Sequence, residues 1–81
     1  MVQISRTQTG LRLERSTLKV LKALAEYLDL SLGDLVEGVV LHAFEGQVPF
    51  GPTVLSKIEQ LKLVYGHTLT AADAHGMTEN E

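Results

Sequence analysis

The chain has 81 residues, no cysteine and a formal net charge of −3. This length allows one small domain, and a monomer of this size buries only a modest share of its surface. The absence of cysteine excludes a disulfide framework and a thiolate metal site, which favours an intracellular protein over a secreted one. We expect a cytoplasmic protein without membrane association, because no apolar run reaches the length of a bilayer span.

The charged residues are unevenly distributed along the chain. Residues 1–22 carry five of the seven basic residues and a single acid, whereas residues 23–81 carry two basic residues and nine acids. This distribution predicts a basic face that could bind a polyanion although the whole chain is acidic. Lysines on the solvated face of a short helix would give the same count, so both interpretations stay open.

The first predicted element is a short strand. Residues 9–13 alternate so that Leu11 and Leu13 lie on one side, and Gly10 and Arg12 on the other. No second convincing strand follows in the chain. An isolated strand leaves backbone donors and acceptors without partners, and it can pair with another copy of itself. The sequence therefore predicts a symmetric homodimer whose two strands form one antiparallel ribbon.

Two amphipathic helices are predicted after the strand. The first is expected from about Arg15 to Leu28, and the second from Leu32 to about Glu45, with Gly46 as its C-terminal stop. Their apolar stripes consist of Leu18, Leu21, Leu24, Ala25 and Leu28 in the first helix, and Leu32, Leu35, Val36, Val39, Val40 and Ala43 in the second.

Ser31 is the predicted N-cap of the second helix. Its hydroxyl can accept a hydrogen bond from the amide of Asp34, and the Asp34 carboxylate can return a bond to Ser31 as in a capping box. This pattern fixes the start of the second helix.

A loop and a third helix are predicted next. Two prolines and a glycine assign residues 47–52 to a loop. The third helix is expected from about Thr53 to Tyr65, and its apolar face needs a cover, which Leu41 and Phe50 could supply.

The chain is predicted to end in a short turn and a flexible tail. Thr70 can cap a turn at the end of a C-terminal helical extension that spans residues 53–75. Residues 76–81 are polar and are expected to be flexible. The extension is either structural cover or a docking surface for another protein, and the sequence does not separate these alternatives.

The order and spacing of the first elements resemble the ribbon-helix-helix family of DNA-binding proteins, the MetJ and Arc type of repressors. The resemblance covers residues 6–45 and rests on Leu11-Arg12-Leu13, Leu18, Leu21, Leu24-Ala25, Leu30-Ser31, Val36 and Val39-Val40. It implies a mainly α fold in which a ribbon-helix-helix homodimer, built from residues 1–46 of each copy, carries the C-terminal helical extension.

The resemblance also implies how DNA would be bound. In this family the ribbon enters the major groove and its outward side chains read base edges. The corresponding positions are Gln8, Gly10 and Arg12, of which Arg12 could contact guanine and Gln8 adenine, whereas Gly10 has no side chain to offer.

A second implied contact is a DNA phosphate at the start of the second helix. Free backbone amides and the positive end of the helix dipole attract an anion there. The implied phosphate contacts are Arg6, Arg15, Lys19, Ser31, Leu32 and Gly33, and the implied dimer core consists of Leu11, Leu13, Leu21, Leu24, Val36, Val39 and Val40.

The sequence thus predicts a homodimeric DNA-binding transcriptional regulator of the repressor type, with double-stranded DNA and a second copy as partners. The alternative is an antitoxin-like or adaptor protein whose residues 47–75 bind a protein partner, with DNA binding secondary or lost. An enzyme is not expected, because no phosphate-binding glycine loop, nucleophile motif or carboxylate pair is recognisable. No cofactor and no metal site are expected, since His67 and His75 lack helical ligand spacing.

Overall fold

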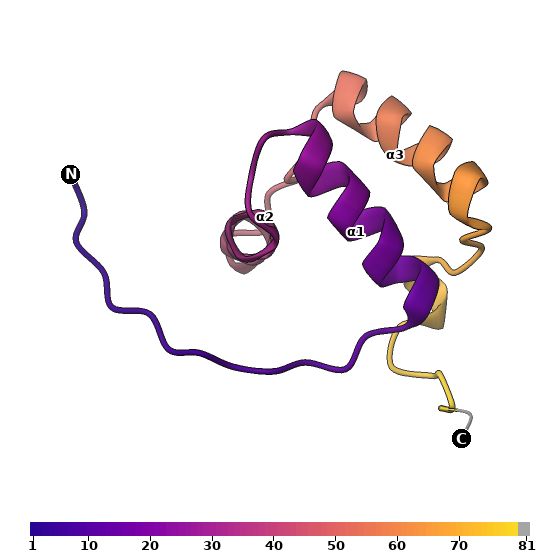
Figure 1. Cartoon of the computed structure of the whole chain (residues 1–81), viewed down its shortest axis with the longest axis horizontal. Helices are drawn as coiled ribbons and strands as arrows, with labels where there is room; N and C mark the ends of the chain where they lie inside the picture. Colours follow the sequence, from indigo (N-terminus) through magenta and orange to yellow (C-terminus); the bar gives the residue numbers. More distant parts are fainter. Residues whose placement is uncertain (80–81) are drawn as a thin grey trace.

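The computed structural model of the chain describes residues 1–79 and is mainly α-helical. The helices are α1 (Arg15–Tyr27), α2 (Leu32–Phe44) and α3 (Pro52–Tyr65), followed by the short 3₁₀ helix η1 (Ala71–Asp73). These bounds confirm the three predicted helices, with every end within one residue of its prediction. In Figure 1, α1 and α3 lie side by side, α2 is seen end-on next to α1, and residues 1–14 form an extended trace.

The N-terminal segment, residues 1–14, contains no helix and no strand, so the chain by itself does not form the predicted ribbon. Every residue of the segment is exposed. None of residues 1–13 forms a backbone–backbone hydrogen bond with another residue of the described chain. The strand and the dimer both require a second copy, and both remain predictions.

Local sequence explains where α2 begins and where α3 begins and ends. The Asp34 amide donates to Ser31 Oγ at 3.1 Å, which confirms the predicted N-cap of α2. Gly66 ends α3 with a φ of 63°, a left-handed conformation that costs glycine little. Pro52 occupies the first turn of α3, where its missing amide proton is not needed.

The core lies where the three helices meet. Leu24 and Ala25 of α1 and Leu35 of α2 are buried, and Leu24 is only 2% exposed. The partly buried side chains around them are Leu21, Leu28, Val39, Phe50, Val54, Ile58 and Leu61. Burial of a leucine side chain stabilises a fold by roughly 1.5–3 kcal/mol, so this small cluster supplies much of the stability of the chain.

The packing of α3 corrects one prediction. Leu41 was expected to cover α3, but it is 63% exposed, and α3 packs along α1 instead. Val54 and Ile58 reach the cluster around Leu24, so α3 completes the core that α1 and α2 begin. Phe50 does pack against this core as expected. The proposed division of the chain after residues 46, 52 and 75 remains a prediction, and the last two residues of the tail lie outside the described chain.

Candidate nucleic-acid interface

The N-terminal segment is held to α2 by an arginine. Arg6 Nη2 donates to Glu37 Oε1 at 3.0 Å and lies 3.4 Å from Asp34 Oδ1. The hydrogen bond to Glu37 and the negative charge of Glu37 raise the pKa of Arg6, and Asp34 adds to the effect. Arg6 was predicted to contact a DNA phosphate. In the chain by itself, its guanidinium group forms ion pairs with the carboxylates of Glu37 and Asp34 instead.

A groove of about 780 Å³ separates the N-terminal segment from α1 and α2. Its apolar lining includes Leu11 and Leu13 from the segment, Leu18 from α1, and Leu32 and Val36 from α2. Three of the implied dimer-core residues, Leu11, Leu13 and Val36, therefore face one space. We call this space the segment groove.

The other implied dimer-core residues are distributed differently. Leu24 is buried in the chain's own core, and Leu21 and Val39 are packed against that core. Val40 is 38% exposed and lies on α2 close to the exposed Phe44. The structure thus divides the predicted set into core residues and residues that are still accessible to a second copy.

The implied base-reading residues do not form one row in the chain by itself. Gln8 lines the segment groove together with Leu11 and Leu13, whereas Arg12 does not. Gly10 is exposed and has open space around it. The Arg12 side chain is 84% exposed and forms an ion pair with Glu79 near the end of the described chain. Arg12 is therefore the one implied reader whose side chain lies away from the groove.

The start of α2 has the geometry expected of an anion site, with one difference. Ser31, Leu32 and Gly33 lie together at the edge of the segment groove, and a Cβ added at Gly33 would meet no atom within 4 Å. The Asp34 carboxylate contacts Arg6 and does not form the reciprocal capping bond to Ser31. Of the predicted capping box, the bond from the Asp34 amide to Ser31 is present and the bond from Ser31 to the Asp34 carboxylate is not. Arg6 gives that carboxylate a charged partner instead.

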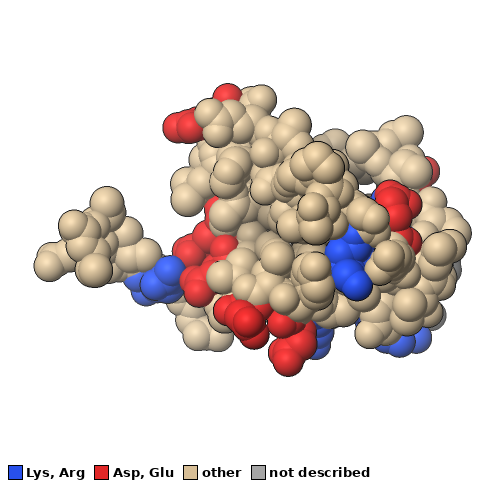
Figure 2. All heavy atoms as spheres, turned by 90° about the horizontal axis from the view of Figure 1, so that it is seen from above, with Lys and Arg blue, Asp and Glu red and all other residues tan. Residues whose placement is uncertain are grey.

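The basic residues of α1 are not gathered at the segment groove. Lys22 lines the segment groove, and Arg15 and Lys19 are exposed on α1. Figure 2 shows basic side chains at the protruding N-terminal end directly beside acidic side chains of the body, and the two signs are interspersed across this view. The bipolar charge of the sequence is thus partly neutralised where the N-terminal segment meets α2.

The N-cap of α1, Glu14, was not predicted from the sequence. The Glu14 carboxylate accepts hydrogen bonds from the amides of Ser16 and Thr17 at 2.9 and 2.8 Å, and from both hydroxyls at 2.7 and 2.9 Å. These bonds, led by the Ser16 hydroxyl and amide, lower the pKa of Glu14 to about 2. Glu14 was recognisable only from its position just before a Ser-Thr pair at a helix start, a weak signal for a long side chain.

His67 connects the end of α3 to the same cap. Its Nε2 lies 3.0 Å from Thr17 Oγ1. The Thr17 hydroxyl donates to Glu14, so the hydrogen bond between His67 and Thr17 is donated by Nε2. The Nδ1 of His67 is buried and has no hydrogen-bond partner among the described residues. Among residues 1–79, no group of three potential metal ligands is found.

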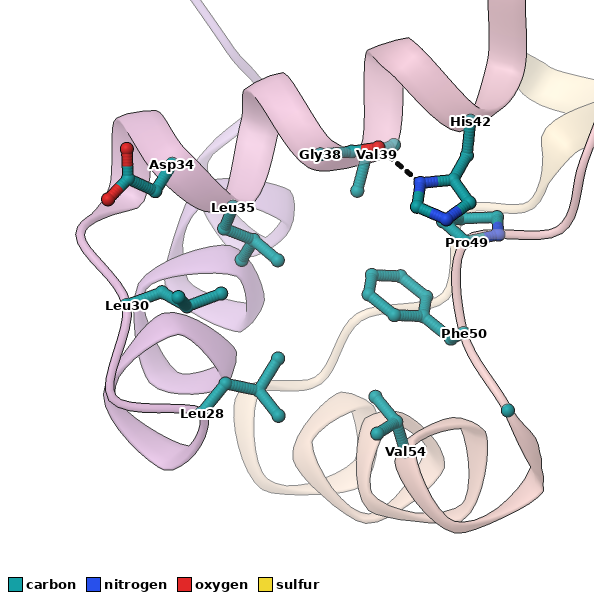
Figure 3. Close-up of a pocket in the computed structure, with 11 residues that line it drawn as sticks. Leu28, Leu30, Asp34, Leu35, Gly38, Val39, His42, Pro49, Phe50 and Val54 are labelled. Carbon is teal, nitrogen blue, oxygen red and sulfur yellow. Dashed lines mark hydrogen bonds between the residues drawn. The ribbon is translucent and has the colours of Figure 1, made fainter. Parts of the chain in front are cut away.

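A second hollow of about 310 Å³ is lined by the connection between α1 and α2, by α2, by the loop after α2 and by the start of α3. Figure 3 shows Leu28, Leu35, Phe50 and Val54 around it, and the Asp34 carboxylate directed away from it. His42 stands at its rim, where Nδ1 and the Gly38 carbonyl oxygen are 2.7 Å apart. The lining is mostly apolar and offers few polar groups to orient a ligand.

Comparisons with known protein families, with curated proteins and with solved structures give no match for this chain. No helix within residues 1–79 combines the length and the apolar character that crossing a membrane requires. Inferences about function therefore depend on the geometry of the chain itself.

Proposed function

We propose that the protein is a homodimeric DNA-binding transcriptional regulator. In this proposal the N-terminal segments of two copies pair as an antiparallel ribbon, which enters the major groove of DNA. The observation that carries the proposal is the segment groove, in which apolar side chains from the segment and from both neighbouring helices face one unfilled space.

Two properties of the segment support pairing with a second copy. Its backbone groups from residue 1 to 13 have no backbone partner in the described chain, so they are free to form a ladder. Leu11 is 70% exposed and Leu13 is 43% exposed, so pairing would remove apolar surface from water. In an antiparallel arrangement the backbone groups of both copies form the same contacts, as a twofold axis requires.

Two features support DNA as the ligand. Arg12 projects away from the groove that the second copy would fill, which is where a base-reading side chain belongs. The capped start of α2 presents the open backbone of Gly33 beside free amides, which suits a phosphate. Arg15 and Lys19 would add salt-dependent attraction to the phosphate backbone.

The test combines DNA selection with matched variants. A duplex is first selected from a random library, and its affinity is then measured by fluorescence anisotropy for the wild type, Arg12→Ala and Lys62→Ala. Lys62 is the control because its removal changes the charge equally but on α3, where it pairs with Glu59. We expect Arg12→Ala to weaken binding roughly 5- to 150-fold, since a bidentate base contact contributes roughly 1–3 kcal/mol. Equal affinity of the two variants would contradict the proposed role of Arg12.

The dimer is tested separately by analytical ultracentrifugation. We expect the wild type to sediment as a dimer at micromolar concentration and Leu11→Asp to sediment as a folded monomer. Leu63→Asp on α3 is the control, because Leu63 is 85% exposed and lies outside the segment groove. A wild type that stays monomeric at every concentration would contradict the ribbon.

A second candidate function is an adaptor or antitoxin-like protein whose C-terminal half binds a protein partner. The exposure of Val48 at 74%, Leu63 at 85% and Val64 at 71% favours it. Truncation after Gly46 cannot test this function, because α3 belongs to the core. Loss of a stoichiometric complex in the Leu63→Asp variant, with DNA binding unchanged, would support it, whereas a wild type that purifies alone would contradict it.

A further inference from the structure

The C-terminal segment leads back from α3 to the start of α1. Gly66 reverses the chain after α3, and the His67 amide donates to the Lys62 carbonyl at 2.9 Å. The His67 side chain then bonds to Thr17 in the first turn of α1. In Figure 1, η1 lies at the same end of the molecule as the start of α1.

A compact turn continues this path. The Thr70 amide and hydroxyl donate to Asp73 Oδ2 at 2.8 and 3.3 Å, which forms a capping box around η1. The Gly76 amide donates to the Asp73 carbonyl at 3.1 Å, which folds the chain once more. These bonds direct residues 77–79 toward the N-terminal segment.

The path ends in an ion pair between Glu79 and Arg12, which are 67 residues apart in sequence. The Glu79 carboxylate thus binds the guanidinium group of Arg12, which in the proposed function contacts a base. A carboxylate there takes the hydrogen bonds that a guanine would accept, and its charge repels DNA phosphates. Arg6 is occupied in the same way by Glu37 and Asp34, so the described chain supplies acidic partners to both arginines of its N-terminal segment.

We infer that the C-terminal segment is an autoinhibitory element that competes with DNA for Arg12. The inference rests on the proposed function. Both side chains of the pair are largely exposed, at 84% and 63%, so the competition is weak and can be reversed by a bound duplex. Its strength falls as salt rises, because exposed charges are screened.

The decisive variant is Glu79→Gln in the full chain, with Glu59→Gln as the matched control. Both remove one negative charge, but Glu59 pairs with Lys62 on α3, away from Arg12. The affinity of each protein for a duplex selected with the wild type is measured by anisotropy at low and at high salt. We expect Glu79→Gln to bind about threefold more tightly than Glu59→Gln at low salt, as befits an exposed ion pair, and the difference to shrink at high salt.

A second measurement follows the ion pair without DNA. The side-chain Nε–H resonance of Arg12, recorded by nuclear magnetic resonance, should shift in Glu79→Gln and stay in place in Glu59→Gln. An Arg12 resonance that is unchanged in both variants would overturn the inference, because the pair would then not exist in solution.

The outcomes separate this inference from the proposed function. If all three proteins bind the duplex with equal affinity, the autoinhibition is overturned and the regulator function stands. If none of them binds duplex DNA even at low salt, the proposed function fails and the autoinhibition fails with it. A gain confined to Glu79→Gln supports both.

Discussion

Arg6 and Glu37 lie 3.0 Å apart and join the extended N-terminal segment to the middle of α2, across 31 residues of sequence. Asp34, one turn earlier on α2, lies 3.4 Å from the same guanidinium nitrogen. The segment is therefore placed by charge at this end rather than by apolar packing. Exposed ion pairs of this kind are weak, so the placement is reversible.

The first prediction concerns this tether. Glu37→Gln removes the charge from the closer of the two Arg6 contacts and so weakens it, and we expect residues 4–10 to become more mobile on the nanosecond timescale. The measurement is the heteronuclear ¹⁵N nuclear Overhauser effect, which should fall for those residues and remain unchanged in α1. Glu45→Gln at the C-cap of α2 is the control. Unaltered order in residues 4–10 would show that something other than Glu37 holds the segment.

The second prediction concerns acid stability. The folded chain holds the pKa of Glu14 at about 2, below its usual 4.5, so the cap of α1 stabilises the fold fully above pH 4.5. This stabilisation is lost as the pH falls from 4.5 toward 2, because in this range Glu14 binds a proton more readily in the unfolded chain than in the folded chain. Glu14→Gln should lower the melting temperature at pH 7 and flatten its decline in that range, measured by circular dichroism at 222 nm.

The control for the acid prediction is Glu26→Gln, which changes an exposed acid on the same helix. Its melting temperature should follow the wild type through the same pH range. If Glu14→Gln keeps the full decline of the wild type, Glu14 is not the group whose protonation weakens the fold.

The third prediction concerns the core. Leu24 is 2% exposed, so Leu24→Ala creates a cavity where the three helices meet and should reduce the free energy of unfolding by roughly 2–5 kcal/mol. Leu63→Ala changes a side chain that is 85% exposed and should stay within about 0.5 kcal/mol of the wild type. Urea unfolding measures both values. Similar losses in the two variants would mean that Leu24 is not the centre of the core.

The fourth prediction compares two glycines. Gly38 lies inside α2 and a Cβ there would meet no atom within 4 Å, so Gly38→Ala should stabilise the chain by about 0.5–1 kcal/mol. Gly66 has a φ of 63°, so Gly66→Ala should destabilise it by about 1 kcal/mol. Opposite shifts of the urea midpoint are expected, and shifts of the same sign would contradict the assigned backbone conformations.

Local patterns were enough to predict the helices. The hydroxyl of Ser31 located the start of α2, and Gly46 and Gly66, both with left-handed φ angles, follow the ends of α2 and α3 as expected. These signals act within one turn of chain, so a sequence displays them directly. The same reasoning failed for Leu41, because which face covers α3 depends on how three helices pack.

The contacts at the candidate interface were beyond such reasoning. The ion pair between Arg12 and Glu79 and the bond between Thr17 and His67 each join residues 50 or more positions apart. No periodicity in the chain indicates them, because they arise only once Gly66 and the turn at Thr70 have redirected the backbone. The sequence predicted that the N-terminal segment needs a second copy, but it did not predict the segment groove.

The open backbone of residues 1–13 also bears on how long the protein lasts in a cell. Proteases bind their substrates as extended chains, and a terminal segment without internal hydrogen bonds needs no unfolding before it is cut. The helical body, whose amides are bonded within α1, α2 and α3, must open first. If two copies pair as proposed, cleavage within residues 1–13 would fall on copies whose segment is unpaired, and pairing would protect the others.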